Sequence, residues 1–202
     1  SHRRSVTGLV LMMAGGVIAY KSKYQPTVAL SSTEAEFTAA SEAGKTTLYL
    51  RSILHELGFT QDLPTLLYED NTGALHMANA QQPTRRTRHM DTKHFALQDW
   101  VEHDQIDVTQ IGTVNNISDA FTKALGRIKF YEQTDVIMGR RIPPYVPSWI
   151  RKDHPAATEM PAQHTPSSHP KPKLISVLES IQTLLPTSFL SRISTTVGSL
   201  GG

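Results

Sequence analysis

The sequence contains no cysteine, which excludes a disulfide framework, thiolate metal sites and a cysteine nucleophile. Any metal site would therefore use oxygen or imidazole ligands. Long apolar runs are also absent, because the longest uncharged apolar stretch, residues 8–20, is interrupted by Gly15 and Gly16 and is shorter than the ~20 residues that a membrane-spanning helix needs. The first four residues do not look like a secretory signal. We therefore expect a soluble protein with no membrane partner.

A strong net charge is lacking too. The 202 residues carry a formal charge of +2 at pH 7, so the overall charge does not argue for nucleic-acid binding. The hydrophobic content of 39% is enough for one core of roughly 100–150 residues. Nine of the twelve prolines follow residue 139, a bias typical of disorder. We expect one domain over residues 1–130, a connector over 131–145 and a Pro/Ser-rich, mostly disordered tail over 146–202.

Apolar residues recur at helical spacing inside this tail, between Leu174 and Leu185. The pattern favours a transient helix or a remnant of read-through sequence. A helix that binds a partner or a membrane surface is the alternative.

The first 130 residues alternate strand-like and helical patterns. Apolar runs at 8–13 and 17–22 flank Ala14-Gly15-Gly16, which predicts an antiparallel hairpin. Apolar residues spaced three and four apart predict an amphipathic helix from Phe37 to Leu57 that ends at Gly58. The elements predicted next are a strand at 65–68, helices at 72–80 and 92–102, a strand at 106–111 and a helix at 117–124. Strands that alternate with helices imply a parallel crossover and an α/β fold.

Three acidic residues lie at junctions between these elements. Glu36 falls in the first turn of a helix, Asp70 directly after a strand, and Asp119 near the start of the last helix. Each has an ordinary explanation, because acidic side chains stabilise helix N-termini by roughly 0.3–1 kcal/mol. Asn71 and Asn116 are also good helix N-caps. The positions alone therefore do not assign a function.

The segment ALSSTEAEF, residues 29–37, contains two glutamates that must differ in role. Ser31 and Glu34 fit the capping-box spacing. Residues two apart on a helix are rotated by about 200°, so Glu34 and Glu36 cannot face the same site. We assign Glu34 to the helix cap and Glu36 to a candidate site.

Four motifs occur in order at compatible separations. They are KSKYQPTVALSSTEAEFTAASEA (residues 21–43), YEDNTGAL (68–75), TRHMDTKHF (87–95) and NISDAFTKAL (116–125). With them, the sequence closely resembles the ribonuclease H domain at the end of the polyprotein of copia-type retrotransposons. The resemblance covers about residues 3–130 and leaves the tail out.

The resemblance implies a ribonuclease H-like fold, a mixed five-stranded sheet with helices on both faces. It implies two Mg²⁺ ions held against the RNA strand of an RNA–DNA hybrid, with Glu36, Asp70 and Asp119 as the catalytic metal ligands. Asn116 matches an asparagine of the last motif and is expected at the nucleic-acid contact. The other partners implied are the reverse transcriptase and integrase segments of the same polyprotein. The expected location is a cytoplasmic virus-like particle, with the nucleus as the alternative.

Carboxylates suit this chemistry because Mg²⁺ prefers oxygen ligands. Two such ions about 3.5–4 Å apart activate a water molecule and stabilise the leaving oxygen. Without metal the clustered carboxylates repel one another, so we expect at least one raised pKa.

Two departures from the family pattern bear on activity. The family carries a D-x-D-W-A-like motif on a strand ahead of the segment that matches RRSVTG (residues 3–8), and this sequence starts too late to contain it. We therefore expect the first catalytic aspartate and half of the opening hairpin to be missing, which predicts an unpaired strand edge and little or no activity. No histidine lies between Val108 and Asp119, which leaves a histidine proton shuttle unsupported. A non-catalytic remnant that binds nucleic acid or protein is the alternative function.

Basic side chains gather between two predicted helices and on the second strand, where they could contact the phosphates of a hybrid. The nucleic-acid-binding candidates are Lys21, Lys23, Arg85, Arg86, Arg88, His89 and Lys93. A solvated charged loop is the alternative. His89 and His94 lie five residues apart without a third ligand nearby, so a histidine metal site has little support. Trp100 falls on the apolar face of its helix, which favours a core position over base stacking.

Overall fold

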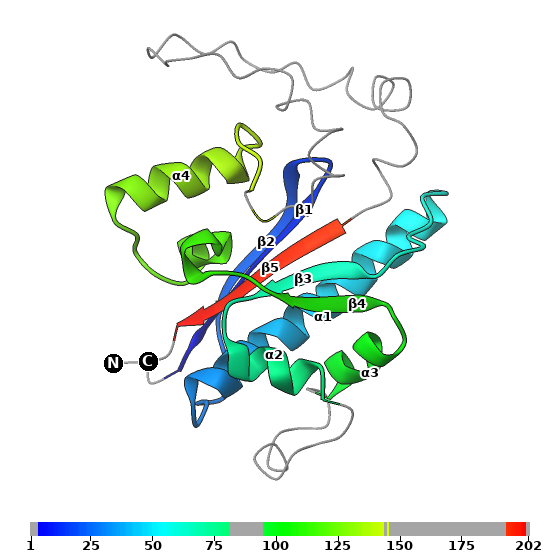
Figure 1. Ribbon diagram of the computed structural model, residues 1–202, viewed down its shortest axis with the longest axis horizontal. Helices are drawn as coiled ribbons and strands as arrows, with labels where there is room; N and C mark the ends of the chain where they lie inside the picture. Colours follow the sequence, from blue (N-terminus) through cyan, green and yellow to red (C-terminus); the bar gives the residue numbers. More distant parts are fainter. Residues whose placement is uncertain (1–3, 81–94, 144, 146–192, 201–202) are drawn as a thin grey trace.

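The computed structural model describes residues 4–80, 95–143, 145 and 193–200. These residues form a five-stranded mixed sheet in the order β2-β1-β5-β3-β4, with helices on its faces (Figure 1). The arrangement confirms the predicted α/β, ribonuclease H-like fold class. No helix among the described residues has the length and apolar character that crossing a membrane requires.

The first two strands form the predicted hairpin. β1, Val6–Met13, pairs antiparallel with β2, Gly16–Tyr24. Ala14 and Gly15 join them with φ angles of 53° and 79°, the left-handed pair that suits the twist of a tight hairpin.

α1, Ser32–Glu56, is the long helix that the apolar spacing predicted. Its start is capped as expected, since Ser31 Oγ accepts the Glu34 N–H at 3.1 Å and the Glu34 carboxylate accepts the Leu30 N–H at 2.8 Å. Gly58 follows its end with a φ of 85°, a conformation that glycine adopts without steric cost.

The next elements form the predicted parallel crossover. β3, Thr65–Glu69, and β4, Ile106–Gln110, are parallel neighbours. α2, Thr72–Ala78, and α3, Ala96–Glu102, lie between them in the chain. The Trp100 ring packs against the core, and a Cβ placed on Gly44 of α1 would lie 2.9 Å from it, so the core position predicted for Trp100 is confirmed.

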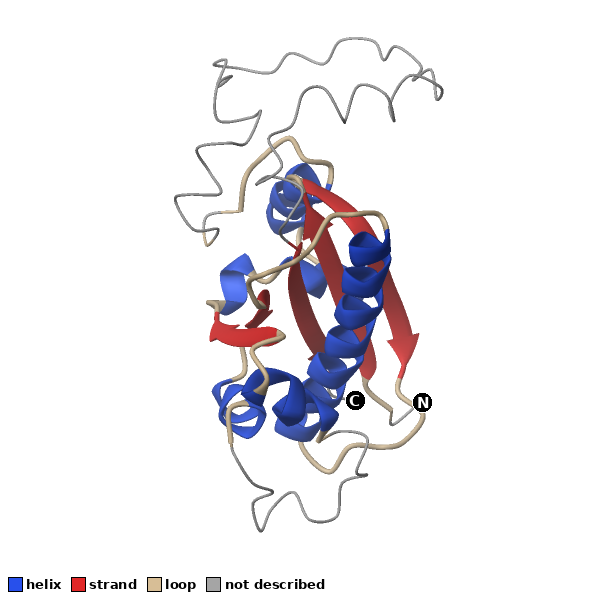
Figure 2. Ribbon diagram, turned by 90° about the vertical axis from the view of Figure 1, so that its right-hand side faces the viewer, coloured by secondary structure: helices blue, strands red, loops and turns tan. Residues whose placement is uncertain are grey.

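β1 is buried on both of its faces, because its side chains alternate between two hydrophobic clusters. Leu9 and Leu11 pack with Phe37 on the side of α1, whereas Val10 and Met12 pack with Val136 on the other side. Figure 2 shows α1 running along one face of the sheet.

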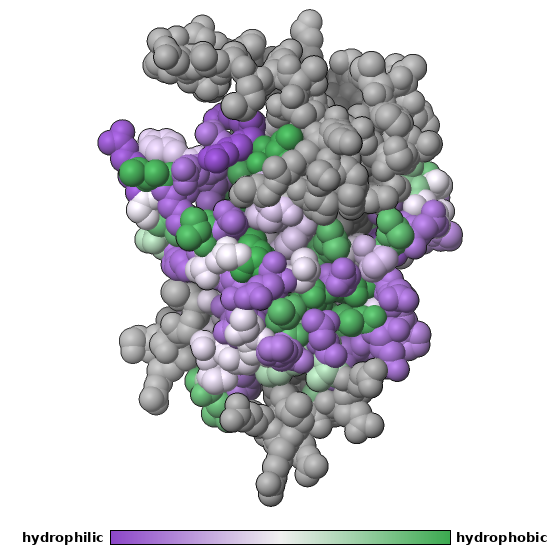
Figure 3. All heavy atoms as spheres, viewed as in Figure 1, coloured by the Kyte–Doolittle hydropathy of each residue, from purple (hydrophilic) through white to green (hydrophobic). Residues whose placement is uncertain are grey.

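The second face is covered by segments that differ from the prediction. The helix expected at 117–124 is a short 3-10 helix, η3, Ile117–Phe121, which follows another, η2, Thr113–Asn115. Gly126 then caps α4, Arg127–Ile137, which runs past residue 130, where the sequence placed the end of the domain. Ile128 and Phe130 on α4 are exposed, and the face in Figure 3 intersperses hydrophobic with hydrophilic residues.

The centre of the sheet is occupied by β5, Ile193–Leu200, from the far end of the chain. It pairs antiparallel with β1 and parallel with β3, and Figure 1 shows it between them. The prediction of an unpaired strand edge beside β1 is therefore wrong. This strand was not predicted, because the surrounding composition is typical of disorder, although Ile193, Thr195, Thr196 and Val197 are β-branched residues that favour strands. The helix predicted over residues 174–185 lies outside the described residues.

Two glycines explain why β5 fits this position. Gly8 of β1 and Gly198 of β5 are register partners, and η3 packs directly over both. A Cβ on Gly8 would lie 2.5 Å from Thr122 Cγ2, and one on Gly198 would lie 2.5 Å from Ser118 Oγ. Because glycine has no side chain, this pair of glycines on neighbouring strands lets η3 approach the sheet closely.

Candidate functional site

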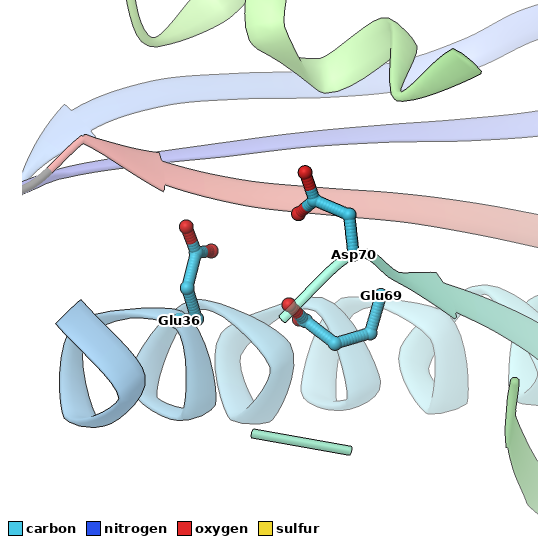
Figure 4. Close-up of side chains that lie close together, drawn as sticks. All are labelled: Glu36, Glu69 and Asp70. Carbon is cyan, nitrogen blue, oxygen red and sulfur yellow. The ribbon is translucent and has the colours of Figure 1, made fainter. Parts of the chain in front are cut away.

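Three carboxyl groups converge where α1 begins and β3 ends. One oxygen from each of Glu36, Glu69 and Asp70 lies within 4.8 Å of the other two. Figure 4 shows Glu36 rising from α1, and Glu69 and Asp70 coming from the end of β3. The structure thus brings together Glu36 and Asp70, two of the three predicted ligands, and adds Glu69.

Sequence reasoning missed Glu69, although the strand pattern contained a signal for it. Side chains two apart on a strand share a face, so Glu69 continues the row of Thr65 and Leu67. All three are buried, and Leu67 packs in the core beneath α1. The alternation therefore directs Glu69 toward the face that carries Glu36.

Burial dominates the electrostatics of this cluster. Glu36 is 9% exposed and Glu69 is 0% exposed. Loss of water raises the pKa of Glu36 to about 8, and the nearby Asp70 and Asp119 add to the rise, although a hydrogen bond from the Ser199 backbone opposes it. Burial raises the pKa of Glu69 to about 9, and Glu36 adds to that rise. The predicted rise in pKa is confirmed, with desolvation rather than repulsion as its largest cause.

Two oxygens of the cluster have no hydrogen-bond partner. Glu69 Oε1 accepts the Asn71 N–H at 2.9 Å, whereas the Oε2 atoms of Glu69 and Glu36 are buried and unpaired. Leaving a buried polar atom unpaired costs about 1–3 kcal/mol, and more for a charged one. Convergent carboxylate oxygens are the donors that hard cations such as Mg²⁺ prefer, so the residues present fit a divalent ion.

Asp119, the third predicted ligand, lies beside this cluster with other partners. Its Oδ1 contacts Lys123 Nζ at 2.8 Å and its Oδ2 contacts Lys129 Nζ at 2.7 Å. Lys123 is four residues further along the chain, and Lys129 comes from α4. Asp119 is close enough to raise the pKa of Glu36, but both of its oxygens are neutralised by lysine.

Asn116 connects Asp70 to the central strand. Its Nδ2 donates to Asp70 Oδ1 at 3.1 Å and to the Val197 carbonyl at 2.9 Å. Its Oδ1 accepts the Ser118 N–H at 3.1 Å, which confirms the predicted N-cap. Asn116 is 0% exposed, so the structure gives it a positioning role at Asp70, where the resemblance implied a contact with nucleic acid.

The basic candidates divide into described and undescribed residues. Lys21 Nζ contacts the Glu42 carboxylate at 2.8 Å, and Lys23 is exposed on β2. Arg85, Arg86, Arg88, His89, Lys93 and His94 lie outside the described residues.

Comparison with known proteins identifies relatives of one kind. The chain is 36% identical over 129 residues to "Retrovirus-related Pol polyprotein from transposon TNT 1-94" of Nicotiana tabacum, which covers 64% of this chain and 10% of that protein. It is 28% identical over 140 residues to "Retrovirus-related Pol polyprotein from transposon RE1" of Arabidopsis thaliana, and this match covers 69% of this chain and 10% of that protein. Its relatives are retrotransposon Pol polyproteins.

The similarity to Pol polyproteins extends beyond plants. The chain is 30% identical over 122 residues to "Transposon Ty1-NL2 Gag-Pol polyprotein" of Saccharomyces cerevisiae, covering 60% of this chain and 7% of that protein. The chain spans about a tenth of the length of the Pol relatives named first, so it corresponds to one segment of such a polyprotein. No protein-family model and no solved structure matches the chain.

Proposed function

We propose that this chain is the ribonuclease H-like segment of a retrotransposon Pol polyprotein. In this proposal it binds RNA–DNA hybrids, and the acidic residues Glu36, Asp70 and Asp119 belong to a Mg²⁺-dependent site at which the parent polyprotein hydrolyses the RNA strand. Its partners are the hybrid and the reverse transcriptase and integrase segments of the same polyprotein.

One observation carries the proposal: acidic side chains from distant parts of the chain converge with buried, unpaired oxygens. Glu36 and Asp70 are 34 positions apart in the numbering, and folding places their oxygens within 4.8 Å. Glu36 and Glu69 have raised pKa values, and each keeps one buried oxygen without a hydrogen-bond partner. This is costly to stability, which favours a functional over a structural explanation. The similarity to Pol polyproteins supports the same family of functions.

Two contacts position the carboxylates of this site. Asn116 holds Asp70 by a hydrogen bond of 3.1 Å, and the Ser199 backbone donates to Glu36. These contacts fix both carboxylates before a substrate arrives. Bound Mg²⁺ would supply a water of lowered pKa and polarise the phosphate.

A non-catalytic, hybrid-binding remnant is the second candidate. The strand beside the cluster, β5, contacts Glu36 through the Ser199 backbone and Asn116 through the Val197 carbonyl, and its sequence ISTTVGSL contains no acidic residue. We therefore expect this chain to bind hybrids and to cleave them slowly or not at all.

The test compares a labelled RNA–DNA hybrid with a DNA duplex of the same sequence. Binding is measured by fluorescence anisotropy in Ca²⁺, and cleavage by gel electrophoresis in Mg²⁺ and in Mn²⁺. Asp70→Asn removes one proposed ligand, and Glu56→Gln is the matched control at the exposed end of α1.

Cleavage that Asp70→Asn abolishes and Glu56→Gln preserves would support the enzyme. Hybrid-selective binding without cleavage would support the remnant. Equal affinity for hybrid and duplex, with no cleavage, would refute both.

A further inference from the structure

We propose that Glu69 is a further metal ligand and that the site binds a single divalent cation between Glu36, Glu69 and Asp70. Two lysines, rather than a second ion, neutralise Asp119. This inference rests on the proposed function and specifies the composition of its acidic site.

The first argument is the state of the Glu69 side chain. It is fully buried at the end of β3, and Oε1 already accepts the Asn71 N–H at 2.9 Å. That bond accounts for one oxygen only, because Oε2 is buried without a partner, as is Oε2 of Glu36. A purely structural glutamate would leave this oxygen uncompensated, whereas a cation bound among the three carboxyl groups would offset the cost of burying them.

The second argument is the spacing of the oxygens. The oxygens of an octahedral Mg²⁺, each about 2.1 Å from the ion, are about 3 to 4 Å apart, and those of the larger Ca²⁺ reach almost 5 Å. The separations between the three oxygens do not exceed 4.8 Å, so the three carboxyl groups are close enough together to be ligands of one ion.

The third argument concerns Asp119. Each of its oxygens has its own ammonium partner, Lys123 at 2.8 Å and Lys129 at 2.7 Å. Lys129 is held further by the Thr113 carbonyl at 3.3 Å. A second divalent cation beside Asp119 would be repelled by these two ammonium groups and would have to displace them. The arrangement therefore supplies two single positive charges where a second ion would otherwise bind.

The experiment measures Mn²⁺ binding to the full chain, with free Mn²⁺ quantified by its electron paramagnetic resonance signal. We expect one equivalent for the unmodified chain and at least a tenfold weaker affinity for Glu69→Gln. Glu69→Asp, which keeps the charge but withdraws the carboxylate, should also weaken binding. Glu56→Gln should bind as the unmodified chain does, and Lys123→Met combined with Lys129→Met should bind a second equivalent.

Folding is checked by urea denaturation without metal, where Glu69→Gln should be at least as stable as the unmodified chain. Normal Mn²⁺ affinity in both Glu69 variants, with binding lost in Asp70→Asn, would overturn the role of Glu69 and leave the proposed function intact. Two equivalents bound by the unmodified chain would overturn the single-ion site alone. No Mn²⁺ binding by the unmodified chain would overturn this inference together with the metal site of the proposed function.

Discussion

The acidic cluster predicts that the metal-free protein loses stability as the pH rises. Glu36 and Glu69 have folded-state pKa values of about 8 and about 9, both above the ordinary value of 4.5. Between pH 4.5 and pH 9 the folded state therefore retains protons that the unfolded state has released. Stability falls with increasing pH wherever the folded state binds more protons, so the two groups cause no loss near pH 4 and their full loss above pH 9.

The size of the effect follows from the pKa shifts. One pKa unit corresponds to about 1.4 kcal/mol, so even one unit from each group gives about 3 kcal/mol. This is a large part of the ~5–15 kcal/mol that stabilises a typical domain. We expect the free energy of unfolding to drop by at least about 3 kcal/mol between pH 5 and pH 9.

The assay is urea denaturation followed by circular dichroism at pH 5, 7 and 9, with chelator present. The double variant Glu36→Gln, Glu69→Gln should lose most of the pH dependence, because its side chains do not ionise. Glu56→Gln should keep it. Histidines titrate in the same range, but they are common to all three proteins and cancel in the comparison. A stability that stays constant or rises from pH 6 to pH 9, or a double variant with an unchanged slope, would refute the reasoning.

Two further predictions concern the frame around the site. Gly198→Val should destabilise the protein by about 1–3 kcal/mol, because the added side chain would overpack against Ser118. The control Gly16→Ala should change the urea midpoint little, because its Cβ would meet nothing within 4 Å. Equal effects of the two substitutions would mean that β5 does not pack beneath η3. Ser31→Ala should cost about 1 kcal/mol by removing the cap that accepts the Glu34 N–H, with exposed Ser32→Ala as the control, and an unchanged thermal midpoint would contradict that assignment.

The sequence alone determined the elements whose signals are local. The Ala14-Gly15 turn sets the hairpin, the apolar spacing and the Gly58 stop set α1, and the order of strands and helices sets the parallel crossover. The capping-box spacing also separated Glu34 from Glu36 correctly, because helical geometry alone rotates them apart. That Glu36 and Asp70 share a site was implied by the resemblance to the ribonuclease H family, and the structure brings one oxygen of each within 4.8 Å.

Only the tertiary structure decided the rest, because it depends on contacts between distant segments. β5 has β-branched residues that favour a strand, but its place in the centre of the sheet depends on distant contacts, where Gly198 pairs with Gly8 and leaves room for η3. The resemblance predicts Asp119 as a metal ligand, and the structure adds an ion pair between its carboxylate and Lys129 of α4. The sequence gives no role to Glu69 beyond its position next to Asp70. The packing of β3 beneath α1 buries its carboxyl group close to that of Glu36. The composition of the acidic site follows from that packing, because burial fixes which oxygens are left without water or a partner.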